Sequence, residues 1–195
     1  MENTSDFIIE TIAPIFNKKG YVGTSLSDMT KATKLTKGAL YCNFKNKEEL
    51  AVKSFQLNIQ KALGPLFVQI SEQSTSLEKL VVLTNYFRNY YDLVKLRGGC
   101  PVLNVGIDAK YNNPALFEET KKAASRLMKG LARIIQFGID SSEIRQSIDP
   151  AKYARIIYAM IEGAVFMSLL YEDRSYLSEV VDSIDDIIST QLKRE

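Results

Sequence analysis

Two helix-start signals close together near the amino terminus constrain the fold of this chain more than any other feature. Ser25 stands three residues before Asp28, which is the spacing of a capping box with Asp in place of the usual Glu or Gln. The apolar residues that follow recur on one helical face: Leu26, Met29 and Ala32. Thr36 can cap a second short helix that ends by Asn43. Two short helices joined by a tight turn predict a helix-turn-helix unit, whose second helix is placed to enter a DNA major groove.

Positive charge is concentrated in the same stretch. From Asn17 to Lys47, seven lysines stand against one acidic residue, Asp28, so the stretch carries +6 while the whole chain carries only +2. Lysines distributed in this way can neutralise phosphates, and the release of counterions then drives binding. The alternative is a solvated lysine surface with no partner, which charge alone does not distinguish from a DNA-binding one.

Several short motifs, each occurring once, stand at fixed offsets from one another between residues 5 and 55. They are Gly20-Tyr21, Thr24-Ser25-Leu26, Asp28-Met29, Ala32, the run Thr36-Lys37-Gly38-Ala39-Leu40-Tyr41, and Phe44 followed by Asn46-Lys47-Glu48-Glu49-Leu50. Together they resemble the amino-terminal domain of tetracycline-repressor-like (TetR/AcrR) regulators. The chain departs from the family pattern at three places: Lys34, where a turn glycine is common, Cys42-Asn43, where an aromatic residue and a histidine are frequent, and Pro14, at a usually non-proline position.

The resemblance implies an all-α fold of about nine helices. A three-helix helix-turn-helix domain is expected over residues 1–47, followed over residues 48–195 by a larger helical domain for ligand binding and dimerisation. The function that it implies is ligand-responsive transcriptional regulation. We expect a repressor that binds a palindromic DNA operator as a homodimer and is released by a small-molecule inducer.

Candidate DNA-contacting residues lie on the second short helix and at the edges of the unit. Small residues let that helix approach the groove, and Ala39 is expected to touch a thymine methyl group, Asn43 an adenine, and Lys37 a guanine or a phosphate. Tyr41 is expected on a phosphate, while Leu40 and Phe44 are expected in the core. The full set on or beside the reading helix is Thr36, Lys37, Gly38, Ala39, Tyr41, Cys42 and Asn43, and the expected backbone contacts are Thr24, Ser25, Lys45 and Lys47. Cys42 is interpreted as a small groove-facing side chain, with a redox sensor as the alternative.

Helical periodicity continues through the remainder of the chain, and no strand-like alternation stands out. The first helix is expected to end at Gly20 with a kink at Pro14, and a long helix from Asn46 is expected to end near Gly64-Pro65. Further helices are expected over residues 77–96, 102–109, 114–139, 150–171 and 176–192, with Asn113-Pro114 and Asp149-Pro150 as start signals.

The last two of these helices carry the widest apolar surfaces. One interpretation is that they close the core of a single chain. The other, which the resemblance implies, is that residues 150–171 and 176–192 pair with the same helices of a second copy. Small residues on the first of the two permit close approach: Ala159, Gly163, Ala164 and Ser168.

The resemblance also implies a cavity for a small apolar or amphipathic ligand. Aromatic and apolar side chains could line it, with tyrosine hydroxyls as polar groups. The candidates are Phe87, Tyr90, Tyr91, Leu103, Ile107, Phe137, Phe166 and Met167. The alternative is that these side chains fill the core. Similarly, Gly99-Cys100-Pro101 either shapes a pocket edge or marks a helix break with a buried thiol.

Enzymatic activity is not expected. The chain has no histidine, the commonest general base and zinc ligand, and it lacks a nucleophile elbow, a phosphate loop and a dinucleotide fingerprint. Its two cysteines, Cys42 and Cys100, lie far apart, which argues against a disulfide framework or a cysteine-rich zinc site. We therefore expect neither a cofactor nor a metal.

A cytoplasmic location without a membrane partner is expected. No apolar run approaches the roughly 18 residues of a transmembrane span, and the polar, acidic amino-terminal residues do not suit a secretory signal. The alternative function is an all-helical ligand-binding or scaffold protein with a vestigial DNA-binding head. The intact Thr36–Tyr41 run and the lysine cluster argue against that alternative.

Overall fold

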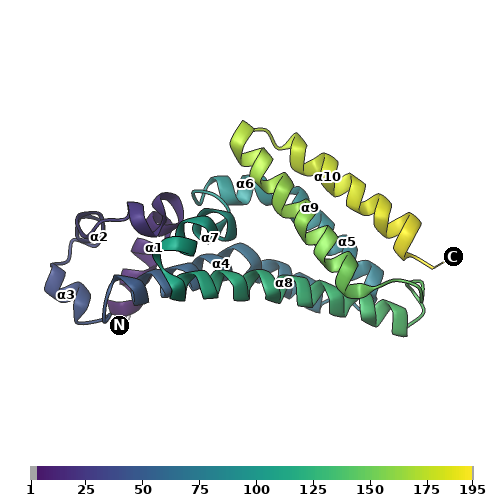
Figure 1. Ribbon diagram of the computed structural model, residues 1–195, viewed down its shortest axis with the longest axis horizontal. Coiled ribbons are helices and arrows are strands. Elements are labelled where there is room, and N and C mark those ends of the chain that lie inside the picture. The colour runs from purple at the N-terminus through teal and green to yellow at the C-terminus, as the bar shows by residue number, and fades with distance from the viewer. Residues whose placement is uncertain (1–3, 195) are drawn as a thin grey trace. The chain divides into compact units, whose positions relative to one another are not determined.

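The chain is all-α, as expected, with ten α-helices in residues 4–194, the part that the computed structural model describes (Figure 1). Within these residues there is no named strand, and the only β-type pairing is an isolated bridge between Ile144 and Lys193. The helices are α1 Thr4–Gly23, α2 Leu26–Thr33, α3 Lys37–Tyr41, α4 Lys47–Ser71, α5 Ser76–Arg88, α6 Tyr90–Lys95, α7 Pro101–Asn112, α8 Pro114–Asp140, α9 Pro150–Tyr171 and α10 Ser175–Ile187, followed by a π-helical turn Ile188–Leu192.

The helices form two compact units that do not follow chain order. The first unit contains the residues up to Ala62 together with Leu96–Ala123, and the second contains Leu63–Lys95 together with the residues from Ala124 onward. A domain division between residues 47 and 48 stays a prediction about the sequence. The compact units divide differently, because α7 packs against α1 within the first unit.

The core of the first unit is built on one face of α1. Ile8, Ile12 and Phe16 are spaced at helical intervals on that face and are buried. They share a single apolar cluster with the helix-turn-helix residues Met29, Leu40 and Phe44 and with residues from α4, α7 and α8: Leu50, Phe55, Val105, Ala109 and Leu116. The two short helices are therefore held by a core that includes residues far along the chain.

The second unit is organised around α9 and α10. α10 packs on α9 and α5, and α6 packs on α9. The buried apolar residues of α10 face this packing: Leu177, Val181 and Ile184. Arg88 of α5 binds two carboxylates of α10, Asp182 at 2.5 Å and Asp185 at 2.8 Å. The start signal at Asp149-Pro150 is confirmed, because the Asp149 carboxylate accepts the N–H groups of Ala151 and Lys152.

One side of α9 is apolar and exposed, and nothing in residues 4–194 covers it. We call this surface the α9 stripe, and it consists of Ile156, Ala159, Gly163, Phe166 and Leu170, which follow one another at intervals of three and four residues. By length and composition, α9 is also the one helix in residues 4–194 that could cross a membrane. The core helix of a soluble protein meets the same criterion, and Ala154, Ile157 and Ile161 of α9 are core residues here.

The predicted end of the first helix at Gly20 is confirmed, because Gly20, at φ 72°, is the only residue inside α1 with non-helical dihedral angles. The irregularity expected at Pro14 does not occur, and two other predicted boundaries are wrong. α4 continues through Pro65 to Ser71. The helix predicted over residues 77–96 is interrupted at Asn89, where the backbone leaves helical geometry. By contrast, α8 and α9 begin at Pro114 and Pro150, as their start signals predict.

Candidate nucleic-acid interface

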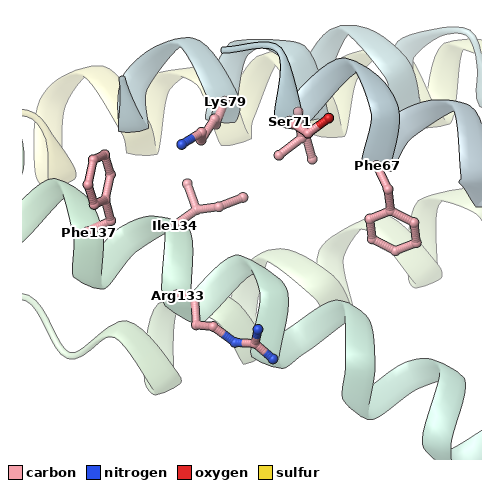
Figure 2. Close-up of a pocket in the computed structure, with 7 residues that line it drawn as sticks. Phe67, Ser71, Lys79, Arg133, Ile134 and Phe137 are labelled. Carbon is pink, nitrogen blue, oxygen red and sulfur yellow. The ribbon is translucent and has the colours of Figure 1, made fainter. Parts of the chain in front are cut away.

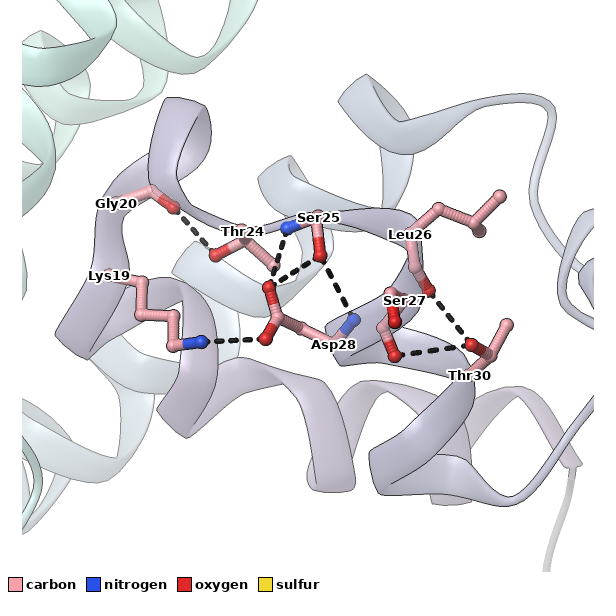
Figure 3. Close-up of polar contacts among 8 residues, drawn as sticks. All are labelled: Lys19, Gly20, Thr24, Ser25, Leu26, Ser27, Asp28 and Thr30. Atoms are coloured by element: carbon pink, nitrogen blue, oxygen red, sulfur yellow. Dashed lines mark hydrogen bonds and ion pairs between the residues drawn. The ribbon is translucent and has the colours of Figure 1, made fainter.

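The amino terminus of α2 is capped as the sequence predicts (Figure 3). The Ser25 hydroxyl accepts the N–H of Asp28 at 3.1 Å, and the Asp28 carboxylate accepts the N–H of Ser25 at 2.8 Å. The same carboxylate pairs with Lys19 at 2.6 Å. The hydrogen bonds from Lys19 and Ser25 hold the pKa of Asp28 well below its usual range. Asp28 therefore fixes the entry to α2 and does not oppose the surrounding lysines with a free charge.

The turn between the two helices depends on Lys34. This residue adopts the left-handed conformation, with φ 57° and ψ 21°, at the C-cap of α2. Glycine is the usual residue at such a position because a Cβ atom is disfavoured there. At this turn the chain has Lys34 where the family commonly has glycine, and Lys34 is the residue of the turn with a strained backbone. Its side chain is exposed.

The second helix, α3, presents its first residues to solvent. Thr36 caps it by accepting the N–H of Ala39 at 3.2 Å. Lys37 and Gly38 are exposed and Ala39 is half-buried, whereas Leu40 is 1% exposed and belongs to the core. The burial predicted for Leu40 and Phe44 is confirmed. The amino-terminal turn of α3 is thus free to enter a groove, while the opposite side anchors it.

One of the predicted DNA contacts does not fit the structure, and a second already has hydrogen-bond partners within the chain. Thr24 is 0% exposed, and its hydroxyl donates to the carbonyl oxygen of Gly20 at 2.7 Å, so this side chain cannot reach a phosphate. The Asn43 amide donates to the carbonyl of Ala39 and accepts from the Ser5 hydroxyl, both at 3.0 Å. Asn43 therefore closes the end of α3, its amide keeps a second donor and a second acceptor site, and its contact with a base stays a prediction.

The remaining predicted residues are accessible to different degrees. Cys42 is exposed and Tyr41 is half-buried. Lys45 is exposed, and its backbone N–H donates to Glu49 at 2.8 Å. The Lys47 ammonium lies 4.4 Å from the centre of the Tyr21 ring, and burial lowers its pKa. Lys45 is therefore the freer of the two cations.

Most of the lysines in this region have no internal partner. Lys19 is paired with Asp28, and Lys47 lies on Tyr21. Within residues 4–194, the other five lysines of the basic stretch form no ion pair, and all are exposed: Lys18, Lys31, Lys34, Lys37 and Lys45. A surface with this charge excess attracts polyanions.

Comparisons with known proteins agree with this geometry. The sequence model described as bacterial regulatory proteins of the tetR family matches residues 8–53, and that of the tetracyclin repressor-like C-terminal domain matches residues 76–184. The chain belongs to the TetR family of transcriptional regulators. A TetR-family regulator from Cytophaga hutchinsonii is 36% identical, with a TM-score of 0.89 and coverage of 98% of this chain and 96% of that one.

Two further relatives span nearly the whole chain. A TetR regulator from Chloroflexus aurantiacus is 30% identical, with a TM-score of 0.92 and coverage of 98% of this chain and 97% of that one. A helix-turn-helix regulator encoded in the lacX 3' region of Lactococcus lactis is 28% identical over 100% of this chain and 95% of its own length. The family consists of regulators, not enzymes, in agreement with the sequence-based prediction.

A group of polar residues that the sequence analysis missed joins the end of α1 to α7 in this TetR-family chain. The Asn17 amide donates to the carbonyls of Arg97 and Gly99, both at 2.8 Å, and the Asn104 amide donates to the carbonyl of Asn17 at 2.9 Å. Asp108 accepts the N–H groups of Tyr21 and Val22. We call Asn17, Asn104 and Asp108 the α1–α7 latch. The partners lie 80 or more residues apart, so no local pattern could have revealed them.

The predicted ligand-lining residues are distributed over both units, and a shared ligand site stays a prediction. Leu103 and Ile107 belong to the first unit and the other six to the second. Phe87, Tyr90 and Tyr91 are buried, and Phe87 and Tyr90 pack ring against ring with centres 5.1 Å apart, so the alternative of core filling applies to them. Ile107, Phe137 and Phe166 are exposed, with Phe166 on the α9 stripe, and Met167 is half-buried. The thiol of Cys100 is buried at the helix break, as one of the two interpretations of that motif expects.

Proposed function

We propose that this chain is a ligand-responsive transcriptional repressor that binds a palindromic operator as a homodimer and is released by a small molecule. The observation that carries the proposal is the exposed amino-terminal turn of α3, anchored by Leu40, in a stretch with five exposed lysines that form no ion pair within residues 4–194. Lys37 and Ala39 are the proposed base-reading residues, with Gly38 allowing close approach and Cys42 beside them. Ser25, Thr36, Tyr41, Lys45 and Lys47 are the proposed backbone contacts.

A homodimer is part of the proposal because a single short helix reads few base pairs. Two copies related by a two-fold axis place their reading helices about one helical turn of DNA apart, roughly 34–36 Å, or a multiple of it. The α9 stripe supports this assembly, since Phe166 and Leu170 are 52% and 58% exposed. The exposed side of α10 carries the acidic residues Glu179, Asp182 and Asp186, so we assign α9 the larger share of a two-helix interface.

The α1–α7 latch is the proposed link between effector and DNA. A ligand acts only by binding one conformation better than another. The latch ties the end of α1, directly before the helix-turn-helix, to α7 and to the Arg97–Gly99 turn. A change in α7 would therefore be transmitted to the entry of α2 through these hydrogen bonds.

Named relatives support repression and small-molecule binding. A Staphylococcus epidermidis protein named as a negative regulator of the biofilm operon is 41% identical over 51 residues, which cover 26% of this chain. A Saccharomonospora viridis regulator of the same fold, 17% identical, was crystallised with choline. A DNA-binding role also places the proposed site of action in the cytoplasm.

Selection of binding sites from randomised DNA duplexes, followed by titration of the selected site at several salt concentrations, tests the proposal. We expect an enriched palindrome and a steep salt dependence. Ala39→Glu should weaken binding to that palindrome at least 100-fold because it places a carboxylate in the groove. Lys45→Ala should weaken binding to all DNA sequences alike and should reduce the slope of log affinity against log salt concentration by about 0.9. Lys193→Ala, an exposed lysine near the end of the chain, is the matched control.

The dimer has its own test in sedimentation measurements. Phe166→Glu should dissociate the dimer, whereas Tyr111→Glu, which changes an aromatic residue that is 79% exposed on α7, should not. A wild-type monomer at micromolar concentration, or a dimer that tolerates Phe166→Glu, would contradict the assigned interface. Failure to enrich any duplex would instead favour the alternative of a ligand-binding or scaffold protein with a vestigial head.

A further inference from the structure

A pocket lined by both apolar and cationic side chains lies within the second unit, between the end of α4, the start of α5 and the last turns of α8 (Figure 2). Its volume is about 290 Å³, close to the lower end of the roughly 300–1,000 Å³ that small-molecule sites occupy. Apolar side chains come from two helices, Phe67 and Ile70 from α4 and Ile134 and Phe137 from α8. Phe67 is 39% exposed and Phe137 is 46% exposed, so apolar surface is open to an occupant.

Two cations line this pocket and no carboxylate does. Figure 2 shows the Lys79 side chain of α5 directed toward the Phe137 ring, and its ammonium lies 4.8 Å from the ring centre. Arg133 is contributed by α8 and is exposed. Within residues 4–194, neither Lys79 nor Arg133 forms an ion pair. The lining therefore has an unneutralised positive charge beside apolar surface.

The carboxylates at this end of α5 are already bound to backbone N–H groups. Glu78 accepts the N–H of Thr75 at 3.0 Å, and Glu143 accepts the N–H of Leu77 at 3.1 Å. These bonds satisfy the first turn of α5, where a helix leaves N–H groups without partners. Both acids are held by the helix start, and neither is among the lining residues.

We propose that this pocket binds a medium-chain aliphatic carboxylate. The carboxylate group would be held by Lys79, with Arg133 adding a second positive charge to the lining, and the aliphatic chain would cover Phe67, Ile70 and Ile134. Charge complementarity selects an anion, and the apolar lining selects an aliphatic chain over a small hydrophilic anion. An aliphatic quaternary ammonium is excluded because both cations repel it and Lys79 already covers the Phe137 ring. The proposal that the pocket binds a carboxylate is argued from the pocket geometry alone. The proposal that this ligand changes DNA binding rests on the proposed function.

Isothermal titration of the full-length protein with three probes of equal chain length tests the site. Octanoate should bind, octanol should bind at least tenfold more weakly, and octyltrimethylammonium should not bind measurably. Butyrate should bind at least tenfold more weakly than octanoate, because it buries less apolar surface. Equal affinity for octanoate and octanol, or no octanoate binding at millimolar concentration, would overturn the proposal.

Matched variants separate the site from general attraction to a basic protein. Lys79→Gln should weaken octanoate binding about tenfold and Arg133→Gln should weaken it less, and both should leave octanol binding unchanged. Arg126→Gln removes an exposed charge two turns earlier on α8, outside the pocket lining, and should leave octanoate binding unchanged. A loss of affinity in Arg126→Gln equal to that in Lys79→Gln would overturn the assignment, since the attraction would then be nonspecific.

A second measurement distinguishes failure of the site from failure of the proposed function. Octanoate is added to the complex of the protein with its selected duplex, and the fraction of bound DNA is followed by fluorescence anisotropy. Release of DNA that Lys79→Gln abolishes supports both proposals. Octanoate binding by calorimetry without any release keeps the site and contradicts its role as the inducer site. Release that persists in Lys79→Gln and Arg133→Gln overturns the pocket as the site of action.

Discussion

The hydrogen bonds that cap the helix-turn-helix and those that join helices of the second unit span very different sequence distances. In the first, Ser25 binds Asp28 and Thr36 binds Ala39, so each cap joins residues three positions apart. In the second, the Ser76 hydroxyl donates to the carbonyl of Ile134, Glu143 accepts from Leu77, and Arg88 reaches Asp182. These pairs lie 58 to 94 residues apart along the chain.

This difference separates what is specified locally from what depends on the assembled unit. A cap forms as soon as its own helix forms, because both partners belong to the same turn. A bond such as that of Ser76 exists only after α5 and α8 have packed. We therefore expect substitutions in the helix-turn-helix to change DNA binding through local helix geometry, whereas substitutions in the second unit act through the stability of the whole unit.

The largest effect is expected where the local helix meets the distant core. Leu40→Ala removes the 1%-exposed side chain that anchors α3, and it should lower the free energy of unfolding by about 2–5 kcal/mol. Chemical denaturation measures this change, with Lys37→Ala on the exposed side of the same helix as the control. A cost for Leu40→Ala no larger than that of the control would mean that caps alone position α3.

Two substitutions with similar expected costs in stability test the distinction between local and long-range hydrogen bonds directly. Thr36→Ala removes the cap of α3 and Ser76→Ala removes the long-range bond to α8, and each should cost about 1 kcal/mol of stability. Only Thr36→Ala should also weaken DNA binding, since it loosens the reading helix. DNA affinity measured well below the melting temperature decides the point, and equal losses of affinity in both variants would break the distinction.

The same distinction explains what could be predicted from sequence. Ser25, Thr36 and the Asp149-Pro150 pair correctly mark helix starts because a cap and its partner lie within one turn. The role of Thr24 is wrong because the bend of α1 at Gly20 buries its side chain, which spacing along the sequence does not indicate. The role of Asn43 stays a prediction, and its bond to Ser5, 38 residues away, depends on how α1 packs.

The pocket and the α1–α7 latch could not be predicted from local sequence patterns. Of the residues that line the pocket, only Phe137 is among the predicted ligand contacts, since Lys79 and Arg133 share no spacing pattern and line one pocket only when α5 and α8 pack. The α1–α7 latch was missed for the same reason. The family resemblance supplied the all-α class and the existence of a ligand domain, but the placement of individual side chains required the assembled helices.

A pH titration should reveal the local ion pair at α2. The pKa of Asp28 is lowered in the folded protein, chiefly by the hydrogen bond from Lys19, relative to an ordinary value of about 3.9. The stability that this carboxylate contributes is therefore present above about pH 4 and is lost as the pH falls below it. Asp28→Asn should give a flatter stability profile between about pH 5 and pH 2 than the wild type. Superimposable profiles would exclude Asp28 as a stabilising acid.

The smallest expected effect concerns Lys34, where local strain and DNA binding work against each other. A non-glycine residue in the left-handed conformation, such as Lys34, costs about 1–2 kcal/mol. Glycine avoids this cost but loses more backbone entropy on folding, which offsets about 0.5–1 kcal/mol of the gain. Lys34→Gly should therefore stabilise the protein by roughly 0.5 kcal/mol. The same substitution removes an exposed cation beside α3 and should reduce the salt slope of DNA binding by up to about 0.9.

Lys34→Asn separates these two consequences, because asparagine tolerates the left-handed conformation but carries no charge. It should weaken DNA binding as much as Lys34→Gly while gaining less stability. If both variants gain stability and keep the wild-type salt slope, Lys34 is only a strained turn residue. If both lose DNA affinity, the chain retains a lysine at this position at the expense of turn stability because the turn itself contacts the DNA backbone.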